Sequence, residues 1–435
     1  MPKSDNVRHF PDSLRRGMRD PILTYAVAAI CGLVFLLLCF IGSHGDAISQ
    51  YFWFDTQDTG MDFFYSIQYV RGREPYAAYS TLYPPLANLL FLIIYRMVPT
   101  GESQYWLDGY WGAAEMRMSP SDLRLSQAPM LMFLLFLLGC CWMLTAIVNS
   151  ILKNHPQGKA NLMAACVLFS PGVLFALERG NILLMVLPLT LFFVYFRNDK
   201  NPVVRELALI SLAVAAGLKL YPALFGILLL RDRKYGQALR AIVYGLAAFL
   251  LPSFAFREGL SFLPIWWDVL TNFESNNYAA ARFLGISVSG ILQMIAYYLN
   301  RFAGITVDSS WFSLAGYAVS LALIVSALTC EKNWQRILCI TMAMLMVQFQ
   351  YSYIFCFVSI PMLLFIAEEK QLTKENALPF VCMLLLTVHI PLCFIQRLPY
   401  LDVRIRQVVS ILLTGWCLAP LFRFTARKIT LVRRK

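Results

Sequence analysis

Three aspartates near residue 60 are the side chains of this sequence best suited to chemistry. Asp55, Asp58 and Asp62 are spaced by three and four residues, so a helix would place all three on one face. A carboxylate among aromatic side chains at a membrane surface can serve as a general base, which makes Asp62 and Asp58 the candidate catalytic residues. The same acids are also typical of an ordinary external loop. No further carboxylates obviously converge here, so we expect neither a metal ion nor another cofactor.

Two short motifs combine turn residues with groups that can bind a substrate. Tyr83-Pro84-Pro85 is typical of a helix start, because proline is favoured in the first turn. Glu178-Arg179-Gly180-Asn181 predicts a tight turn in which Gly180 has a positive φ and Asn181 caps the next helix. An acid and a base at a membrane boundary are costly, and such residues are usually functional or paired. Four residues therefore join the candidate substrate pocket: Tyr83, Glu178, Arg179 and Asn181.

A third motif interrupts the long apolar stretch 206–230. Lys219-Leu220-Tyr221-Pro222 carries a proline, which removes a helical hydrogen bond, so the stretch is either a re-entrant pair or two short helices. Lys219 then lies at the tip of the break, where a lysine can extend its charge to the membrane interface. The functional alternative is that Lys219 binds a lipid phosphate through its positive charge. Lys219, Tyr221 and Arg282 are the candidate phosphate-binding residues.

The composition shows what kind of protein must position these residues. Of 435 residues, 59% are hydrophobic and 14% are charged, whereas soluble domains carry about 25% charged residues. This excludes a soluble enzyme, a disordered chain and a fibrous protein. The net charge of +12 comes mainly from short basic segments between apolar runs, which is typical of cytoplasmic loops and does not indicate nucleic-acid binding. The eleven cysteines lie in or beside apolar segments and form no disulfide or zinc pattern.

The apolar segments predict an all-α fold, a polytopic transmembrane bundle of about 10–13 helices, some of them short or re-entrant. The clear candidates are 22–41, 128–149, 160–177, 181–196, 241–255, 312–329, 337–349, 354–366, 377–394 and 407–424. The ambiguous ones are 83–98, 206–230 and 283–299.

The basic loops also predict the organisation of the chain across the membrane. A cytoplasmic N-terminus (1–21) precedes the transmembrane domain (22–424), and a basic cytoplasmic tail (425–435) follows it. The loops 150–160, 197–205, 231–240, 331–336 and 367–375 are predicted on the cytoplasmic side. The external side receives a catalytic loop (44–82) and a second loop (256–282). Within 44–82 we expect an amphipathic surface helix from Asp62 to Val70.

The ordered set of motifs resembles the GT-C superfamily of polytopic glycosyltransferases, and most closely the GT87 group, which contains polyprenyl-phosphate-dependent alpha-mannosyltransferases. The resemblance is carried by Asp62 with Tyr65, Gly72, Pro75 and Tyr76, by Tyr83-Pro84-Pro85, by Glu178–Asn181 and by Lys219–Pro222 with the basic loop after it. It implies a GT-C-like fold with external loop helices, Asp62 as the catalytic acid residue of the first external loop, and Tyr65 in the pocket. Members often carry a His-Tyr pair in the C-terminal half. Here that region reads Gln348 to Tyr353, without histidine, and supplies Gln350 and Tyr351 as further pocket candidates.

Three function classes were weighed. A transporter or flippase should show two related halves and polar residues midway along its helices, and neither is evident. A polysaccharide polymerase or ligase should have a larger external loop, richer in Arg and His, in the C-terminal half. The sequence favours a multi-pass glycosyltransferase of a bacterial plasma membrane. It would move a hexose, most simply mannose, from a polyprenyl-phosphate-sugar donor to a lipid-linked or glycan acceptor on the extracytoplasmic face, with inversion. Its partners would be those two substrates and membrane lipids, with no nucleic acid.

Overall fold

The computed structural model describes residues 19–42, 59–98, 123–276, 285–347, 351–392 and 401–432. This described part is all-α, with 18 α-helices and no strand. Three candidate site residues, Asp58, Arg282 and Gln350, lie outside the described residues.

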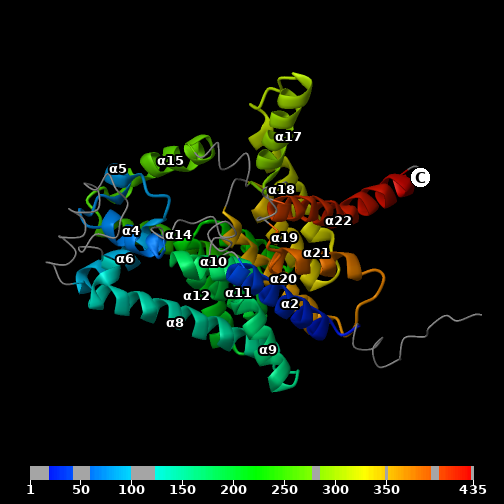
Figure 1. Ribbon diagram of the computed structural model, residues 1–435, viewed down its shortest axis with the longest axis horizontal. Coiled ribbons are helices and arrows are strands. Elements are labelled where there is room, and N and C mark those ends of the chain that lie inside the picture. The colour runs from blue at the N-terminus through cyan, green and yellow to red at the C-terminus, as the bar shows by residue number, and fades with distance from the viewer. Residues whose placement is uncertain are drawn as a thin grey trace, which may run out of the picture.

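Figure 1 shows the arrangement of the helices in space. The first half contains α2 (Pro21–Gly42), α4 (Met61–Tyr69), α5 (Pro75–Tyr79), α6 (Pro85–Met97), α8 (Gln127–Ile151), α9 (Gln157–Leu168), α10 (Pro171–Arg179), α11 (Leu183–Phe196) and α12 (Pro202–Leu218). The second half contains α13 (Ile227–Arg231), α14 (Tyr235–Leu250), α15 (Phe262–Asn276), α17 (Val288–Ala303), α18 (Phe312–Thr329), α19 (Asn333–Val347), α20 (Ser359–Glu368), α21 (Ala377–Thr387) and α22 (Leu401–Val432).

These helices outnumber the predicted 10–13 because proline-containing breaks divide several apolar segments. The segment 160–177 becomes α9 and α10, which meet at an angle of 58° just before Pro171. Four helices of the described part are long and apolar enough to cross a membrane, or five if the bent pair is one span: α2, α8, α14 with its extension to Ala255, α18, and the pair α9–α10. Several other predicted segments, such as 181–196 and 377–394, form shorter apolar helices.

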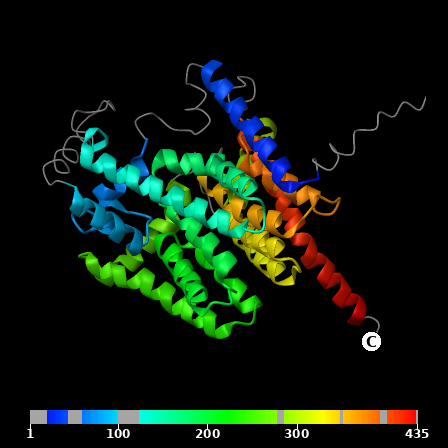
Figure 2. The ribbon, with the colours of Figure 1, turned by 90° about the horizontal axis from the view of Figure 1, so that it is seen from below.

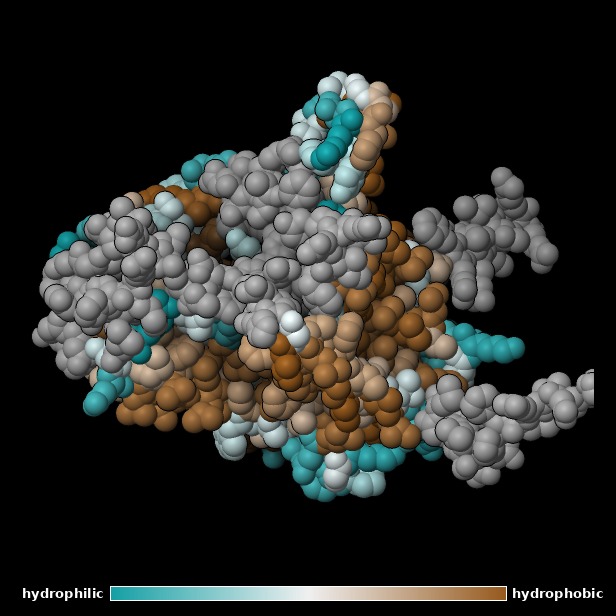
Figure 3. Space-filling view, viewed as in Figure 1, coloured by the Kyte–Doolittle hydropathy of each residue, from teal (hydrophilic) through white to brown (hydrophobic). Residues whose placement is uncertain are grey.

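The surface of the bundle matches a lipid environment. Large apolar side chains of α8, such as Leu131, Leu138 and Trp142, are exposed, and Figure 3 shows a broad hydrophobic area over this side of the molecule. A water-soluble monomer rarely exposes an apolar area of this extent. In Figure 2, α2 crosses over the C-terminal helices, and α22 extends away from the bundle.

The predicted break at Lys219 is present. Helix α12 ends at Leu218, Lys219 has an extended backbone, and a 3-10 helix, η3 (Tyr221–Gly226), leads into α13. The two arms return to the same end of the molecule, because Asn198 before α12 donates to Asp232 after α13 (2.9 Å). The predicted break is therefore confirmed, with Lys219 at the turn between α12 and η3.

The loops predicted on one face meet at one end of the bundle. Arg197 binds Asp232, and Lys332 binds Glu369, which joins four of these loops. Lys159 binds Asp20 of the N-terminal segment at 2.6 Å. The grouping of the loops follows the basic pattern of the sequence, while the side of the membrane that this end faces stays a prediction.

At the other end, the two predicted external loops bind each other. Arg73 donates to the carbonyl of Ala255, and the Glu258 carboxylate accepts from the backbone amide of Tyr76 at 2.9 Å. The indole of Trp266 donates to the carbonyl of Leu82 at 3.1 Å. Residues 73–82 are thereby fixed against the segment from Ala255 to α15.

The expected surface helix is present as α4, but its predicted orientation is wrong. Phe63, Ile67 and Val70, which we expected against lipid, are 0–1% exposed inside the protein. Phe63 packs on Phe91 of α6 and on Phe133 of α8, with ring centroids 5.8 and 5.2 Å away. The apolar face of α4 is covered by neighbouring helices, which a periodic pattern alone cannot distinguish from lipid.

Candidate active site

The Asp62 carboxylate is held by two side chains from the turn between α10 and α11. Arg179 Nη2 donates to one oxygen at 2.9 Å, and Asn181 Nδ2 donates to the other at 2.6 Å. Asn181 is 1% exposed, whereas the side chains of Asp62 and Arg179 remain 19% and 18% exposed. The carboxylate is therefore fixed in orientation while part of it stays accessible.

The backbone of this turn explains why the sequence needs a glycine there. Gly180 has φ of +64°, and a Cβ at this position would lie 2.5 Å from Cε2 of Phe133. Asn181 accepts from the amide of Leu183, the first residue of α11, at 2.9 Å, while its Nδ2 donates to Asp62. The Glu178 carbonyl accepts from the amide of Gly60 at 2.8 Å, which ties the turn to the start of α4. The predicted positive φ is present, whereas the N-cap of α11 is Ile182, one residue after the predicted Asn181.

Lys219 approaches the same site from the break between α12 and η3. Its Nζ lies 4.7 Å from the centroid of the Tyr83 ring and 6.0 Å from that of Tyr353. Burial lowers the pKa of Lys219 to about 8, and the nearby Asp62 carboxylate acts in the opposite direction. The predicted helix start at Pro85 is present, and it presents Tyr83 beneath the ammonium group.

The remaining candidates lie around this centre. Tyr221 is half-buried and packs edge-on against Phe357, at 5.4 Å between centroids. Tyr65 stacks on Tyr69, one turn further along α4, at 6.2 Å. Tyr351 is more exposed, and its ring centroid lies 5.8 Å from that of Tyr353. Glu178 contributes to the turn through its backbone carbonyl, as described above.

Tyr353 is the residue that reasoning from the sequence missed. It is the second residue of the 3-10 helix η6 (Ser352–Val358), and it interacts with Asn181, Asp62 and Arg179. The resemblance indicated the right segment, but pointed to Gln350 and Tyr351. No local signal distinguishes Tyr353 from Tyr351, because Tyr353 reaches the site through the packing of η6 against α10.

The comparison with protein families adds the identity of the chain. A family model described as glycosyltransferase family 87 matches residues 81–348, which is more than half of the sequence. The chain belongs to glycosyltransferase family 87. No curated protein and no solved structure matches it.

The family-87 match covers much of the site but not all of it. Tyr83, the turn from Glu178 to Asn181 and the break at Lys219 lie within the matched residues. Asp62 precedes the match and Tyr353 follows it. The place of Asp62 in this glycosyltransferase therefore depends on its contacts with Arg179 and Asn181, both of which lie inside the matched region.

An apolar groove of about 500 Å³ adjoins the site of this family-87 chain. It runs between α12, η3, α13 and α14, from Ala238 to Phe249 and Trp266, and Leu220 beside Lys219 forms part of its wall. Several wall positions are small, among them Ala216, Ala223 and Gly245, which leaves room between the helices. Residues of α14 form one wall of the groove, and α17 does not contribute to its described lining.

The charges that meet at Asp62 are suited to an anionic ligand. Arg179 and Lys219 lie near the carboxylate of Asp62, and the buried carboxylate of Glu178 adds a second acid to the turn that carries Arg179. In the same described part of the chain, no group of three or more His, Cys, Asp or Glu could hold a metal ion. The side chains present offer a base, two cations and several tyrosine hydroxyls.

Proposed function

We propose that this family-87 glycosyltransferase moves a hexose, most simply mannose, from a polyprenyl-phosphate-sugar donor to a lipid-linked or glycan acceptor. One observation carries the proposal: an oriented carboxylate and a lysine lie together where an apolar groove begins. A lipid-linked phosphosugar needs this combination, because its tail is apolar, its phosphate is anionic and its sugar must meet a base.

The reaction that suits the site is a single displacement with inversion. The acceptor hydroxyl attacks the anomeric carbon and passes its proton to the Asp62 carboxylate. The bond between the anomeric carbon and the phosphate oxygen breaks, and the electron pair leaves with polyprenyl phosphate. Because Asn181 and Arg179 each occupy one carboxylate oxygen, we propose that they hold Asp62 in position for the acceptor hydroxyl. General base catalysis of this kind contributes roughly 10²–10⁴-fold.

The donor is recognised through its phosphate and its tail. Lys219 and Arg179 supply positive charge beside Asp62 that a phosphodiester can meet. Lys219 is the proposed phosphate ligand, since a lysine ammonium is a good point charge for a phosphate. Leu220 follows directly and begins the groove wall, so the tail can enter the groove as the phosphate binds.

The proposed site opens to the extracytoplasmic side of a bacterial plasma membrane. The basic loops gather at the opposite end of the bundle, and such loops favour the cytoplasmic side. A donor carried by a polyprenyl phosphate would then present its sugar to Asp62 from the outer leaflet.

A donor panel with the purified protein tests this proposal. We expect sugar transfer from a polyprenyl-phosphate hexose, with mannose above glucose, and the product should have the anomeric configuration opposite to that of the donor. The matched control offers the same sugar as a nucleotide diphosphate and should give no transfer. Retained configuration would exclude the single displacement. Repeated addition to a growing glycan would support a polymerase, and movement of the donor across vesicles without transfer would support a transporter.

A further inference from the structure

A second polar cavity lies at the opposite end of the bundle from Asp62. Its volume is about 470 Å³, and it is lined by residues of five loop regions, around 151–155, 194–198, 232, 333–336 and 364–368. Polar cavities of this size are typical of small-ligand sites. Its lining includes two arginines, Arg197 and Arg336, and two acids, Asp232 and Glu368.

Arg197 and Asp232 form the fixed part of this cavity. Arg197 is 4% exposed. Its Nε donates to Asp232 at 3.3 Å, its Nη2 donates to Asn333 at 2.8 Å, and its Nη1 donates to the carbonyl of Val194. Asn198 adds a further hydrogen bond to Asp232. This pair is occupied in holding three loops together, so it has little capacity left for a ligand.

Arg336 and Glu368 differ from that pair because they retain binding capacity. Arg336 donates through Nε and Nη2 to the carbonyls of Cys330 and Glu331, and its Nη1 has no hydrogen-bond partner among the described residues. Glu368 is exposed at the cavity, where it accepts from the amide of Trp334 at the long distance of 3.4 Å and also interacts with the side chain of Asn333.

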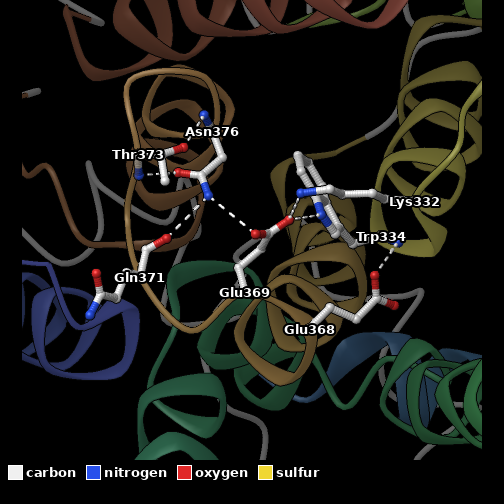
Figure 4. A network of polar contacts seen from close by, with 7 residues as sticks. All are labelled: Lys332, Trp334, Glu368, Glu369, Gln371, Thr373 and Asn376. Carbon is white, nitrogen blue, oxygen red and sulfur yellow. Dashed lines mark hydrogen bonds and ion pairs between the residues drawn. The ribbon is translucent and has the colours of Figure 1, made fainter.

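The neighbouring acid, Glu369, shows what a purely structural carboxylate looks like here. Figure 4 shows its side chain between Lys332, Trp334 and Asn376, whereas Glu368 is joined in the same view only to the backbone amide of Trp334. Glu369 accepts from Lys332 at 2.5 Å, from the Trp334 indole at 2.9 Å and from Asn376 at 3.4 Å. The two adjacent glutamates thus differ in position, because Glu368 lines the cavity and Glu369 does not.

The charges of the cavity restrict the class of ligand. The two arginines and two acids of the described lining sum to zero, so a ligand with a large net charge is disfavoured. Because Arg336 and Glu368 both retain capacity to bind a ligand, they favour a zwitterion, which carries one charge of each sign. Quaternary ammonium groups are usually bound in aromatic cages, and Tyr195 and His155 are the only aromatic rings of the described lining. A primary ammonium, in contrast, can donate directly to a carboxylate.

We propose that this cavity binds a phosphoethanolamine group, with its phosphate at Arg336 and its ammonium at Glu368. Asn154, Asn198 and Asn333 supply further polar contacts around it. The group can come from a phospholipid of the adjacent leaflet or from a soluble phosphoethanolamine, since both present the same chemistry. The site is separate from Asp62 and does not depend on the proposed transfer reaction.

Titration of the purified full chain in detergent tests the proposal. The probes are dihexanoyl phosphatidylethanolamine, its phosphatidylcholine and phosphatidylglycerol counterparts, and free phosphoethanolamine. We expect saturable binding of the ethanolamine lipid, with the choline and glycerol lipids at least about tenfold weaker. Free phosphoethanolamine that binds as tightly as the lipid identifies a soluble source, and much weaker binding identifies a lipid source.

Two glutamate variants make the test specific. Glu368→Gln should weaken binding of the ethanolamine lipid about tenfold and should remove the preference over the choline lipid. Glu369→Gln is the matched control and should leave the affinity unchanged, even where it lowers the thermal stability. Equal binding of the glycerol lipid, equal effects of the two variants, or no saturable binding of any probe would overturn the proposal.

Discussion

The two ends of the bundle each contain an arginine paired with an aspartate, and they use the pair differently. Arg197 and Asp232 are bound further by Val194, Asn333 and Asn198, and Arg197 is almost completely buried. Arg179 and Asp62 are each close to one-fifth exposed.

The surroundings of the two pairs differ as well. Asp62 interacts with a lysine, lies close to tyrosine rings, and is near the start of an apolar groove. Asp232 lies among asparagines and backbone carbonyls that connect loops. An ion pair alone therefore does not indicate a reactive site. Accessibility, a nearby lysine and an adjacent apolar groove distinguish the Asp62 end.

Removal of the Asp62 carboxylate should have the largest effect. Asp62→Asn keeps the side-chain volume but loses the proton acceptor, so we expect a loss of transfer of roughly 10²–10⁴-fold. The measurement is the initial rate with saturating donor. Asp20→Asn is the control, because it removes an acid that is also ion-paired, to Lys159 at the other end. Equal rates of transfer in Asp62→Asn and Asp20→Asn would contradict a special role of Asp62 in catalysis.

A variant of Asn181 tests whether the orientation of the Asp62 carboxylate matters for the reaction. In Asn181→Asp the hydrogen bond from the amide of Leu183 is retained, since an aspartate oxygen also accepts, but the donor to Asp62 is replaced by a second carboxylate. A hydrogen bond to a charged group contributes about 1.5–3 kcal/mol, so kcat should fall by about 10–100-fold. Circular dichroism checks that helicity persists. Full activity in this variant would remove Asn181 from any positioning role.

Lys219 predicts a pH dependence that the opposite end lacks. Its ammonium is charged below a pKa of about 8 and loses its proton above it. If the charged form binds the donor phosphate, kcat/KM should fall about tenfold between pH 7 and pH 9. This fall in kcat/KM reports a group of the free enzyme, so kcat, which reports the enzyme–substrate complex, should change less with pH. Lys219→Arg keeps its charge throughout this range and should remove the decline. An unchanged decline would assign it to another group.

Replacement of Gly180 should have the smallest effect, and this effect is a loss of thermal stability. Gly180→Ala places a Cβ 2.5 Å from Phe133 at φ +64°, which costs about 1–3 kcal/mol. Gly139 in α8 is the matched control, because a Cβ there meets nothing within 4 Å and alanine favours a helix. Thermal unfolding in detergent should give a lower Tm for Gly180→Ala and an unchanged or higher Tm for Gly139→Ala.

The sequence predicted the elements of the fold better than their environment. Apolar runs and prolines were enough to predict the helical bundle, the start of α6 at Pro85 and the break at Lys219, because these follow from local chemistry. The same pattern could not tell whether Phe63 faces lipid or protein, since both favour an apolar side chain.

The site was predictable where motifs are local. The turn from Glu178 to Asn181 was predicted with its positive φ, and the predicted cap was one residue away from the N-cap at Ile182. The pairing of Asn181 and Arg179 with Asp62 joins residues more than 110 positions apart, and no local signal determines it. Tyr353 was missed for the same reason, because it reaches the site only through the packing of η6 against α10.

The sidedness of the two ends is the most direct test of the central claim, which is that transfer takes place at an outward-facing Asp62 end. Ser80 is exposed at that end, and Lys374 is exposed in a loop of the opposite end. Each is replaced by cysteine in separate variants, and intact cells are treated with a membrane-impermeant thiol reagent, with the parent chain as the background. We predict that Ser80→Cys reacts from outside and that Lys374→Cys reacts only after the membrane is opened. Reaction of Lys374→Cys in intact cells, with Ser80→Cys protected, would place Asp62 in the cytoplasm and contradict the account.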